Sequence, residues 1–107
     1  MKTPIIIDSF GDVLVFESVE DAECYLEPID VANDEYIGYD SEGRLLQLLV
    51  TDSNRVSIQS AESEPKHSAE LRKVMTFFLS NIGVSESWLS DASLQKLVER
   101  LLEHKIK

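Results

Sequence analysis

Residues 35–60 read EYIGYDSEGRLLQLLVTDSNRVSIQS, and this stretch carries the strongest fold signal of the chain. Three apolar runs rich in β-forming residues, at 35–39, 44–51 and 55–60, are separated by the polar segments DSEG and DSN. Gly43, in the first of these segments, suits the left-handed position of a bulged hairpin turn. We therefore predict a three-stranded antiparallel meander.

Upstream of the meander, the pattern predicts one or two further strands and a short helix. PIIID (4–8) and DVLVF (12–16) flank a turn signal, so they form a hairpin, or only the second run is a strand. Ser18 is a suitable N-cap and Pro28 ends the segment, which indicates a helix over 19–27. The side of this helix that we expect to be buried comprises Val19, Ala22, Tyr25 and Leu26.

Two amphipathic helices are predicted downstream. Apolar residues recur at helical spacing over 68–82, where Gly83 is the stop signal, and again over 91–106, where Ser90 or Asp91 would be the cap. The aromatic residues expected in the core of this half are Phe77, Phe78 and Trp88.

The predicted architecture is a single α+β domain over residues 1–107. A chain of 107 residues has room for one hydrophobic core and not for two. Because a meander cannot hide its own apolar face, one face of the sheet must pack on the two C-terminal helices. We therefore expect two layers: the helices, and an antiparallel sheet made of the meander plus an N-terminal strand or hairpin.

Acidic charge is concentrated in the first part of the chain. The formal net charge is -10 at pH 7 and the pI is ≈ 4.5. Residues 1–43 hold twelve acidic side chains and one basic one, whereas residues 44–107 hold eight acidic and nine basic ones. Nucleic acid and anionic membranes are polyanions and are therefore disfavoured as direct partners. A basic partner, or solubility alone, fits this charge.

The sequence indicates neither catalysis nor a bound metal. Cys24 is the only cysteine, and the spacing places neither His67 nor His104 beside it, so we expect an exposed, incidental thiol. There is no CxxC or HExxH motif, and DVANDE (30–35) lacks the glycine and the spacing of a calcium loop. Neighbouring carboxylates could act as acid and base only within a pocket that shifts their pKa values apart. We expect a protein without enzymatic activity or cofactor.

A single cysteine and a short apolar N-terminus predict a cytoplasmic protein. A lone cysteine cannot form an internal disulfide and suits a reducing compartment. The start MKTPIIID contains three consecutive isoleucines, too few for a signal peptide or a membrane span.

The run ESVEDAECYLEPIDVANDEY (17–36) contains eight acids among twenty residues and no Lys or Arg. A solvated face is one interpretation, but adjacent like charges repel, and surfaces that only confer solubility mix both signs. The other is a docking surface for a cationic partner, formed by the helix, an acidic loop over 28–35 and the hairpin turn at 40–43. Tyr36 and Tyr39 face opposite sides of one strand, so one of them could anchor a partner. The candidate partner-binding residues are Glu20, Asp21, Glu23, Glu27, Asp30, Asp34, Glu35, Tyr39, Asp40 and Glu42.

GDVLVFESVEDAECYLEPIDV (11–31) followed by YIGYDSEGRLLQLLV (36–50) resembles the small bacterial immunity proteins of contact-dependent inhibition and related polymorphic toxin systems. The similarity covers about the first half of the chain: a strand, an acidic helix ending in LEP, and a YDxEGR hairpin. It implies a non-catalytic protein that binds the toxic C-terminal domain of a cognate toxin, commonly a nuclease, and so protects the producing cell. A nuclease engages phosphates with Lys and Arg, and an acidic protein can cover that surface.

Two other classes of protein stay open. A small acidic regulatory or adaptor module, or a homodimeric binding protein whose acids only confer solubility, would have the same composition. An enzyme with dispersed carboxylates would need a deep acidic pocket with a neighbouring histidine. We expect a monomer or a weak homodimer.

Overall fold

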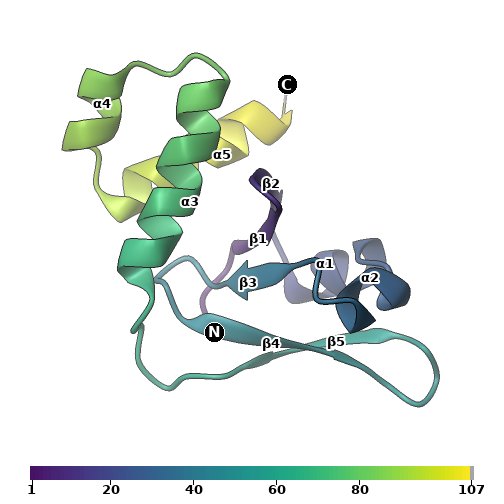
Figure 1. The fold of residues 1–107 in the computed structure, drawn as a ribbon. Helices are drawn as coiled ribbons and strands as arrows, with labels where there is room; N and C mark the ends of the chain where they lie inside the picture. Colours follow the sequence, from purple (N-terminus) through teal and green to yellow (C-terminus); the bar gives the residue numbers. More distant parts are fainter. Residues whose placement is uncertain (107) are drawn as a thin grey trace.

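A five-stranded antiparallel sheet is the centre of the fold, and the computed structural model describes residues 1–106 (Figure 1). Its strands are β1 (Ile5–Ser9), β2 (Asp12–Phe16), β3 (Ile37–Tyr39), β4 (Leu45–Val50) and β5 (Val56–Ser60). They lie in the order β2-β1-β3-β4-β5, and each neighbouring pair is antiparallel. The predicted meander is confirmed as β3–β4–β5, and the two N-terminal runs form a hairpin, which was one of the two alternatives.

The helices within residues 1–106 are α1 (Val19–Tyr25), α2 (Pro28–Ala32), α3 (Ser68–Asn81), α4 (Glu86–Asp91) and α5 (Leu94–Ile106). Ser18 caps α1 as predicted, because its hydroxyl accepts the N–H of Asp21 at 3.0 Å. The helix predicted over 68–82 is confirmed as α3. With the antiparallel sheet and these helices, the predicted α+β class is confirmed.

The acidic loop predicted over 28–35 is wrong in its first part, because α2 occupies this segment up to Ala32. Proline has no backbone N–H, but the first N–H groups of a helix have no partner within the helix. Pro28 at the start of α2 therefore loses no hydrogen bond, and its fixed φ already suits a helix. The same residue thus separates α1 from α2 and begins the second helix.

The helix predicted over 91–106 begins later in the structure. Ser93, rather than Ser90 or Asp91, caps α5, because its hydroxyl accepts the N–H of Lys96 at 3.2 Å. The preceding residues form α4, a separate helix of 6 residues. In a helix this short, too few apolar residues recur at helical spacing for the sequence pattern to predict it.

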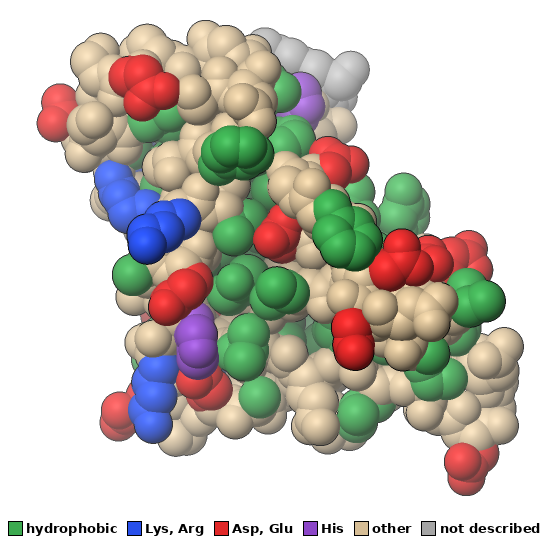
Figure 2. Space-filling model, in the orientation of Figure 1, with side chains coloured by type: hydrophobic (Ala, Val, Ile, Leu, Met, Phe, Trp, Pro, Cys, Tyr) green, Lys and Arg blue, Asp and Glu red, His purple; other side chains and the backbone are tan. Residues whose placement is uncertain are grey.

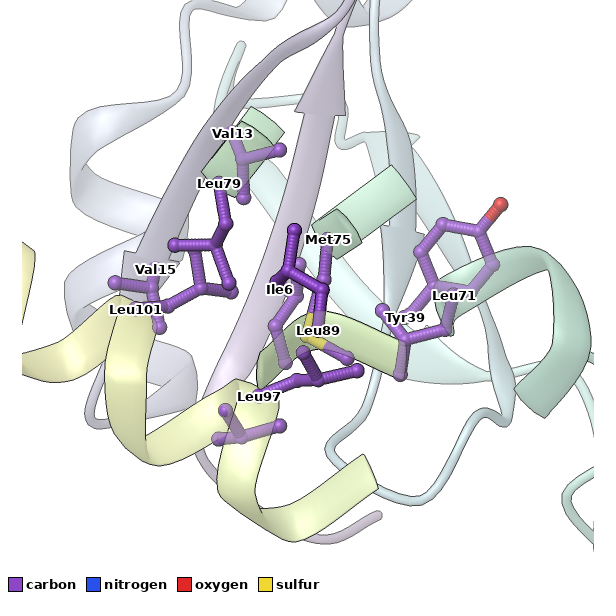
Figure 3. Packing of buried hydrophobic residues seen from close by; sticks show 11 residues of the cluster. Ile6, Val13, Val15, Tyr39, Leu71, Met75, Leu79, Leu89, Leu97 and Leu101 are labelled. Atoms are coloured by element: carbon purple, nitrogen blue, oxygen red, sulfur yellow. The ribbon is translucent and has the colours of Figure 1, made fainter. Parts of the chain in front are cut away.

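β1 is buried on both faces and divides the core in two. Ile5, Ile6 and Ile7 are fully buried, and successive side chains of a strand point to opposite faces. On the face of Ile6 the sheet packs on α3, α4 and α5, as predicted (Figure 3). The buried residues of this cluster are Ile6, Val13, Val15, Tyr39, Leu71, Met75, Leu79, Leu89, Leu97, Val98 and Leu101.

The opposite face of the sheet, that of Ile5 and Ile7, is covered by α1 and α2 (Figure 1). These short helices add a partial third layer to the two predicted layers. The buried residues of the second cluster are Ile5, Ile7, Phe16, Ala22, Leu26, Val31, Leu46, Val56 and Ile58. Because complete burial of one such aliphatic side chain contributes about 1.5–3 kcal/mol, β1 alone anchors both layers strongly.

Three aromatic residues predicted in the core are exposed instead: Tyr25 by 60%, Phe77 by 61% and Trp88 by 39%. Phe77 lies about 120° around α3 from the buried Leu71, since each helical residue turns by about 100°. Tyr25 lies at the margin of the narrow buried side of α1 and rests against Phe16, with ring centroids 5.3 Å apart. Phe78 packs against the core, as predicted.

The turn between β3 and β4 rests directly on the start of α3. Gly43 has a φ of +98°, as its predicted place in a hairpin turn requires. A Cβ atom at this position would lie 2.4 Å from the Cα of Ser68, and the C=O of Gly43 accepts the N–H of His67 at 2.9 Å. The backbone at Gly43 therefore contacts the backbone at His67 and Ser68 directly, and this contact fixes the position of the first turn of α3.

We predict that Gly43→Ala lowers the free energy of unfolding by about 2–4 kcal/mol, because left-handed strain and a clash with the α3 backbone act together. Gly83→Ala is the matched control. Gly83 also has a positive φ, +97°, but nothing lies within 4 Å of its Cβ position. It should lose only about 1 kcal/mol in urea unfolding followed by circular dichroism. Equal losses for the two variants would contradict the close contact at Gly43.

Candidate partner-binding surface

The acidic residues of α1, α2 and the turn after α2 lie on one side of the molecule (Figure 2). α1 is a short amphipathic helix: Ala22 and Leu26 are buried, and Glu20 and Asp21 in its first turn face solvent. Val31 holds α2 to the same core. We call the acids of this region the acidic surface, apart from Glu23, whose carboxylate binds β5, and its members are Glu20, Asp21, Glu27, Asp30, Asp34 and Glu35.

No ion pair neutralises the acidic surface within residues 1–106. The salt bridges of this part of the chain lie at the β3–β4 turn, in the connector before α3 and on α5. Arg55 shares a hollow with Glu20 and Glu27 but forms no ion pair with either. Lys105 lines another hollow with Asp21 and Tyr25 of α1, and the other Lys and Arg side chains visible in Figure 2 lie away from α1 and α2. The local field is therefore negative, because six acids outnumber Arg55 and Lys105 and form no ion pair with them.

Asp30, Glu35 and Tyr36 form a coupled cluster within this region. The Tyr36 hydroxyl donates a hydrogen bond to Asp30 Oδ2 at 3.2 Å. A hydrogen bond with the Asp30 carboxyl, then burial and the charge of Asp30, raise the pKa of Glu35. Burial, then the hydrogen bond to Asp30 and the neighbouring carboxylates, raise the pKa of Tyr36. The raised pKa of Glu35 reflects chiefly the hydrogen bond with Asp30 and to a smaller extent the charge of Asp30, and a cation placed beside the pair would oppose it.

Two residues predicted to contact a partner are buried, so these two predictions are wrong. Tyr39 is 5% exposed and packs on the helical layer, and Asp40 is 0% exposed. Tyr36 packs on the opposite cluster, which confirms that the two tyrosines face opposite sides of the strand. The position of Tyr39 follows from the strand alternation, which points its side chain toward α3.

Glu23 and Glu42, also predicted to contact a partner, are tied to the fold. Glu23 Oε2 accepts the N–H of Ile58 at 2.8 Å on β5, an edge strand whose free N–H groups could otherwise pair with another chain. Glu42 forms ion pairs with Lys2 and Arg44, so its charge is compensated within the chain. Both side chains are half-exposed, but the carboxylate of Glu23 is hydrogen-bonded to β5 and that of Glu42 is ion-paired, so we do not count either in the acidic surface.

The buried Asp40 carboxylate accepts hydrogen bonds from several groups around the β3–β4 turn. Its carboxylate accepts backbone N–H groups of Lys2 at 3.0 Å, Glu42 at 3.0 Å and Arg44 at 2.9 Å. The Arg44 guanidinium donates a further hydrogen bond at 3.2 Å. Burial raises the pKa of Asp40, but together these donors outweigh burial and hold the pKa below its ordinary value. The ionised form therefore stabilises the fold, and that contribution is lost as the pH falls through the lowered pKa.

Sequence reasoning missed exposed hydrophobic residues near the acidic surface. Phe10 in the β1–β2 turn is 80% exposed, and Ile37 at the start of β3 is 48% exposed. The signal that could have found Phe10 is the turn itself, because Phe-Gly stands where Asn-Gly or Asp-Gly is typical. The sequence contains no comparable signal for Ile37. Its exposure depends on how much of the sheet the helical layer covers, which is a property of the tertiary fold.

Comparison with known proteins supplies no assignment for this surface. No protein-family model matches the chain, and neither a curated protein nor a solved structure matches it. Within residues 1–106, no group of three or more His, Cys, Asp or Glu side chains is arranged to hold a metal ion. In the same part of the chain, no helix has the length and apolar character needed to cross a membrane. Cys24 is exposed, as predicted.

We predict that Asp40→Asn lowers the free energy of unfolding by about 2–3 kcal/mol at neutral pH, because an amide replaces one of the two accepting oxygens by an NH2 donor and has no charge to balance the guanidinium. The difference from wild type should shrink as the pH falls through the lowered pKa of Asp40, where the wild type loses its carboxylate. Asp52→Asn, at an exposed turn position, should change little. Denaturant unfolding at several pH values measures both, and a pH-independent difference for Asp40→Asn would contradict the role of the ionised form.

Proposed function

We propose that this chain is an immunity protein that binds and neutralises the toxic C-terminal domain of a cognate toxin, a basic domain of nuclease type, through the acidic surface. The observation that carries the proposal is the uncompensated negative charge on α1, α2 and the turn after α2. The resemblance of residues 11–31 and 36–50 to such proteins supports the same assignment.

Concentrated like charge is unfavourable for a free protein. Each close pair on a helix destabilises it by about 0.2–0.5 kcal/mol, and the raised pKa of Glu35 shows that one pair is close enough to interact. Solubility needs only dispersed charge of both signs. A cationic partner would relieve the repulsion, and the field of the acidic surface would accelerate its approach.

The fold presents these carboxylates on anchored elements. Ala22 and Leu26 hold α1 to the sheet, Val31 holds α2, and Glu23 ties α1 to β5 through Ile58. Charges that are already positioned lose little conformational freedom on binding. A partner that matches the arrangement would therefore gain most of the available electrostatic attraction.

Neutralisation follows from the chemistry of the proposed partner. A nuclease binds phosphates with Lys and Arg, and a surface of carboxylates can occupy the same side chains. Covering the basic face would exclude nucleic acid, and binding beside the active site would use the same charge complementarity. The proposal assigns no catalytic step and no cofactor to this chain.

Charge reversal of Glu20, Asp21 and Glu27 to Lys should weaken binding to the toxin domain encoded by the adjacent upstream gene. We expect Kd to rise by roughly 10–100-fold at low ionic strength, because three favourable interactions become repulsive. The difference should narrow at high salt, where exposed charges are screened. Isothermal titration calorimetry at two salt concentrations measures the effect.

The matched control reverses three exposed acids outside the acidic surface, Asp52, Glu64 and Asp91. It changes the net charge equally, and at low salt it should raise Kd far less than the first variant does, because these acids lie outside the proposed interface. Unchanged affinity for the first variant at low salt would remove the acidic surface from the interface. A chain that binds no such domain and sediments as a stable dimer would instead support the homodimeric class of protein.

Binding should also weaken as the pH falls from neutrality through the raised pKa of Glu35. The proton taken up by Glu35 removes negative charge that a cationic partner would contact. By linkage, the partner should favour deprotonated Glu35, so complex formation releases protons in this pH range. Glu35→Gln should flatten the dependence of Kd on pH, whereas Glu103→Gln on α5 should preserve it.

A further inference from the structure

Phe10 occupies a position that disfavours phenylalanine on two independent grounds. It has a φ of 51°, in the left-handed region, and its side chain is 80% exposed. The other non-glycine residues with positive φ within residues 1–106 are Asp34 and Asn54, whose short polar side chains tolerate this conformation. Neither local backbone preference nor core packing explains a phenylalanine here.

The β1–β2 turn that carries Phe10 lies against α3. A Cβ atom on Gly11 would lie 3.6 Å from Cε1 of Phe77, which is itself 61% exposed. Asp8 Oδ1 accepts the N–H of Gly11 at 3.0 Å and so fixes the turn. Asp8 is also paired across the ladder with Ile37, which is 48% exposed. We call Phe10, Ile37 and Phe77 the apolar patch.

The patch continues onto a part of the sheet that the helical layer leaves open. α3 and α5 pack mainly over β2, and on the same face Gln47 of β4 and Gln59 of β5 are exposed. Leu49 on this face is half-exposed. Figure 2 shows hydrophobic side chains between α3 and the acidic side chains near α1 and α2.

Charges around the patch are predominantly acidic. Asp8 lies within it, and burial together with the charges of Asp8 and Glu70 raises the pKa of the adjacent Tyr39. The residues immediately before Tyr36 in the chain are Asp34 and Glu35, which belong to the acidic surface and lead into β3. Lys73 is a basic side chain on α3 between the positions of Glu70 and Phe77. Asp34 and Glu35 are therefore the members of the acidic surface that lie next to the patch along the chain, because they lead into Ile37.

We propose that the apolar patch is the hydrophobic centre of a docking face, and that its occupant is a segment of the basic partner with apolar side chains flanked by Lys or Arg. The inference rests on the proposed function, because it assigns the patch to the same partner as the acidic surface. A second copy of this chain fits less well, since each copy has a net charge of -10 and would bring acids against acids. Aromatic side chains that become fully desolvated carry much of the energy of such interfaces.

The test substitutes Phe10→Asn, which suits a left-handed turn position. The thermal midpoint of the free protein should rise by roughly 2–5 °C, because the backbone strain and the exposed ring are removed. Binding of the upstream-encoded toxin domain should weaken roughly 10–30-fold in Kd. A residue with only a structural role would not raise stability and lower affinity together.

A second variant and a control keep the result interpretable. Phe77→Ser on the exposed side of α3 should weaken binding in the same way, whereas Trp88→Ser, an exposed aromatic on α4, should leave Kd unchanged. The wild type could bind the domain, and charge reversal could weaken that binding, while neither Phe10→Asn nor Phe77→Ser changes Kd. In that case the proposed docking face is wrong and the proposed function stands. If the wild type does not bind the domain, the proposed function is wrong, and the docking face that rests on it is wrong as well. A dimer in sedimentation that Phe10→Asn dissociates would assign the patch to self-association and overturn the inference.

Discussion

The contact of the β3–β4 turn with the start of α3 is the constraint on which the two halves of the fold depend. Asp40 gathers the backbone of Lys2 and of Arg44 around one buried carboxylate. Gly43 then meets the backbone at Ser68 with no room for a side chain. Because the N-terminus, the meander and the helical layer meet within these few residues, a change here alters the placement of every layer at once.

Much of the fold could be predicted because its signals are local. Hairpin turns, helix caps and apolar periods each involve residues close in sequence, and these features predict the meander and α3 and give the N-terminal hairpin as one of two alternatives. Pro28 predicts the end of α1, but its chemistry equally suits the first turn of a helix, and it also begins α2. Counting both Phe77 and Phe78 in the apolar stripe of α3 predicts that both are buried, but one residue along a helix changes the direction of a side chain by about 100°, and Phe77 is exposed.

The acidic surface was predictable in part, because burial of Ala22 and Leu26 forces the remaining side of α1 toward solvent. The structural use of individual acids was not. Glu23 binds an N–H that is 35 positions away in sequence, and Asp40 binds one that is 38 positions away. Both acids resemble their exposed neighbours in sequence, and only the tertiary fold brings a donor to each of them.

The features that the fold does not explain share one physical property: each is unfavourable in the free chain and would be relieved by contact. The Asp30–Glu35 pair holds like charges together, and Phe10 combines left-handed backbone with an exposed ring. A partner that neutralised the first and covered the second would bind only the folded chain, because only the fold places the β1–β2 turn against α3 and holds α2 on the other face of the sheet. Such a partner must raise the free energy of unfolding by mass action. The left-handed backbone of Phe10 and the proposed binding would then have the same physical origin.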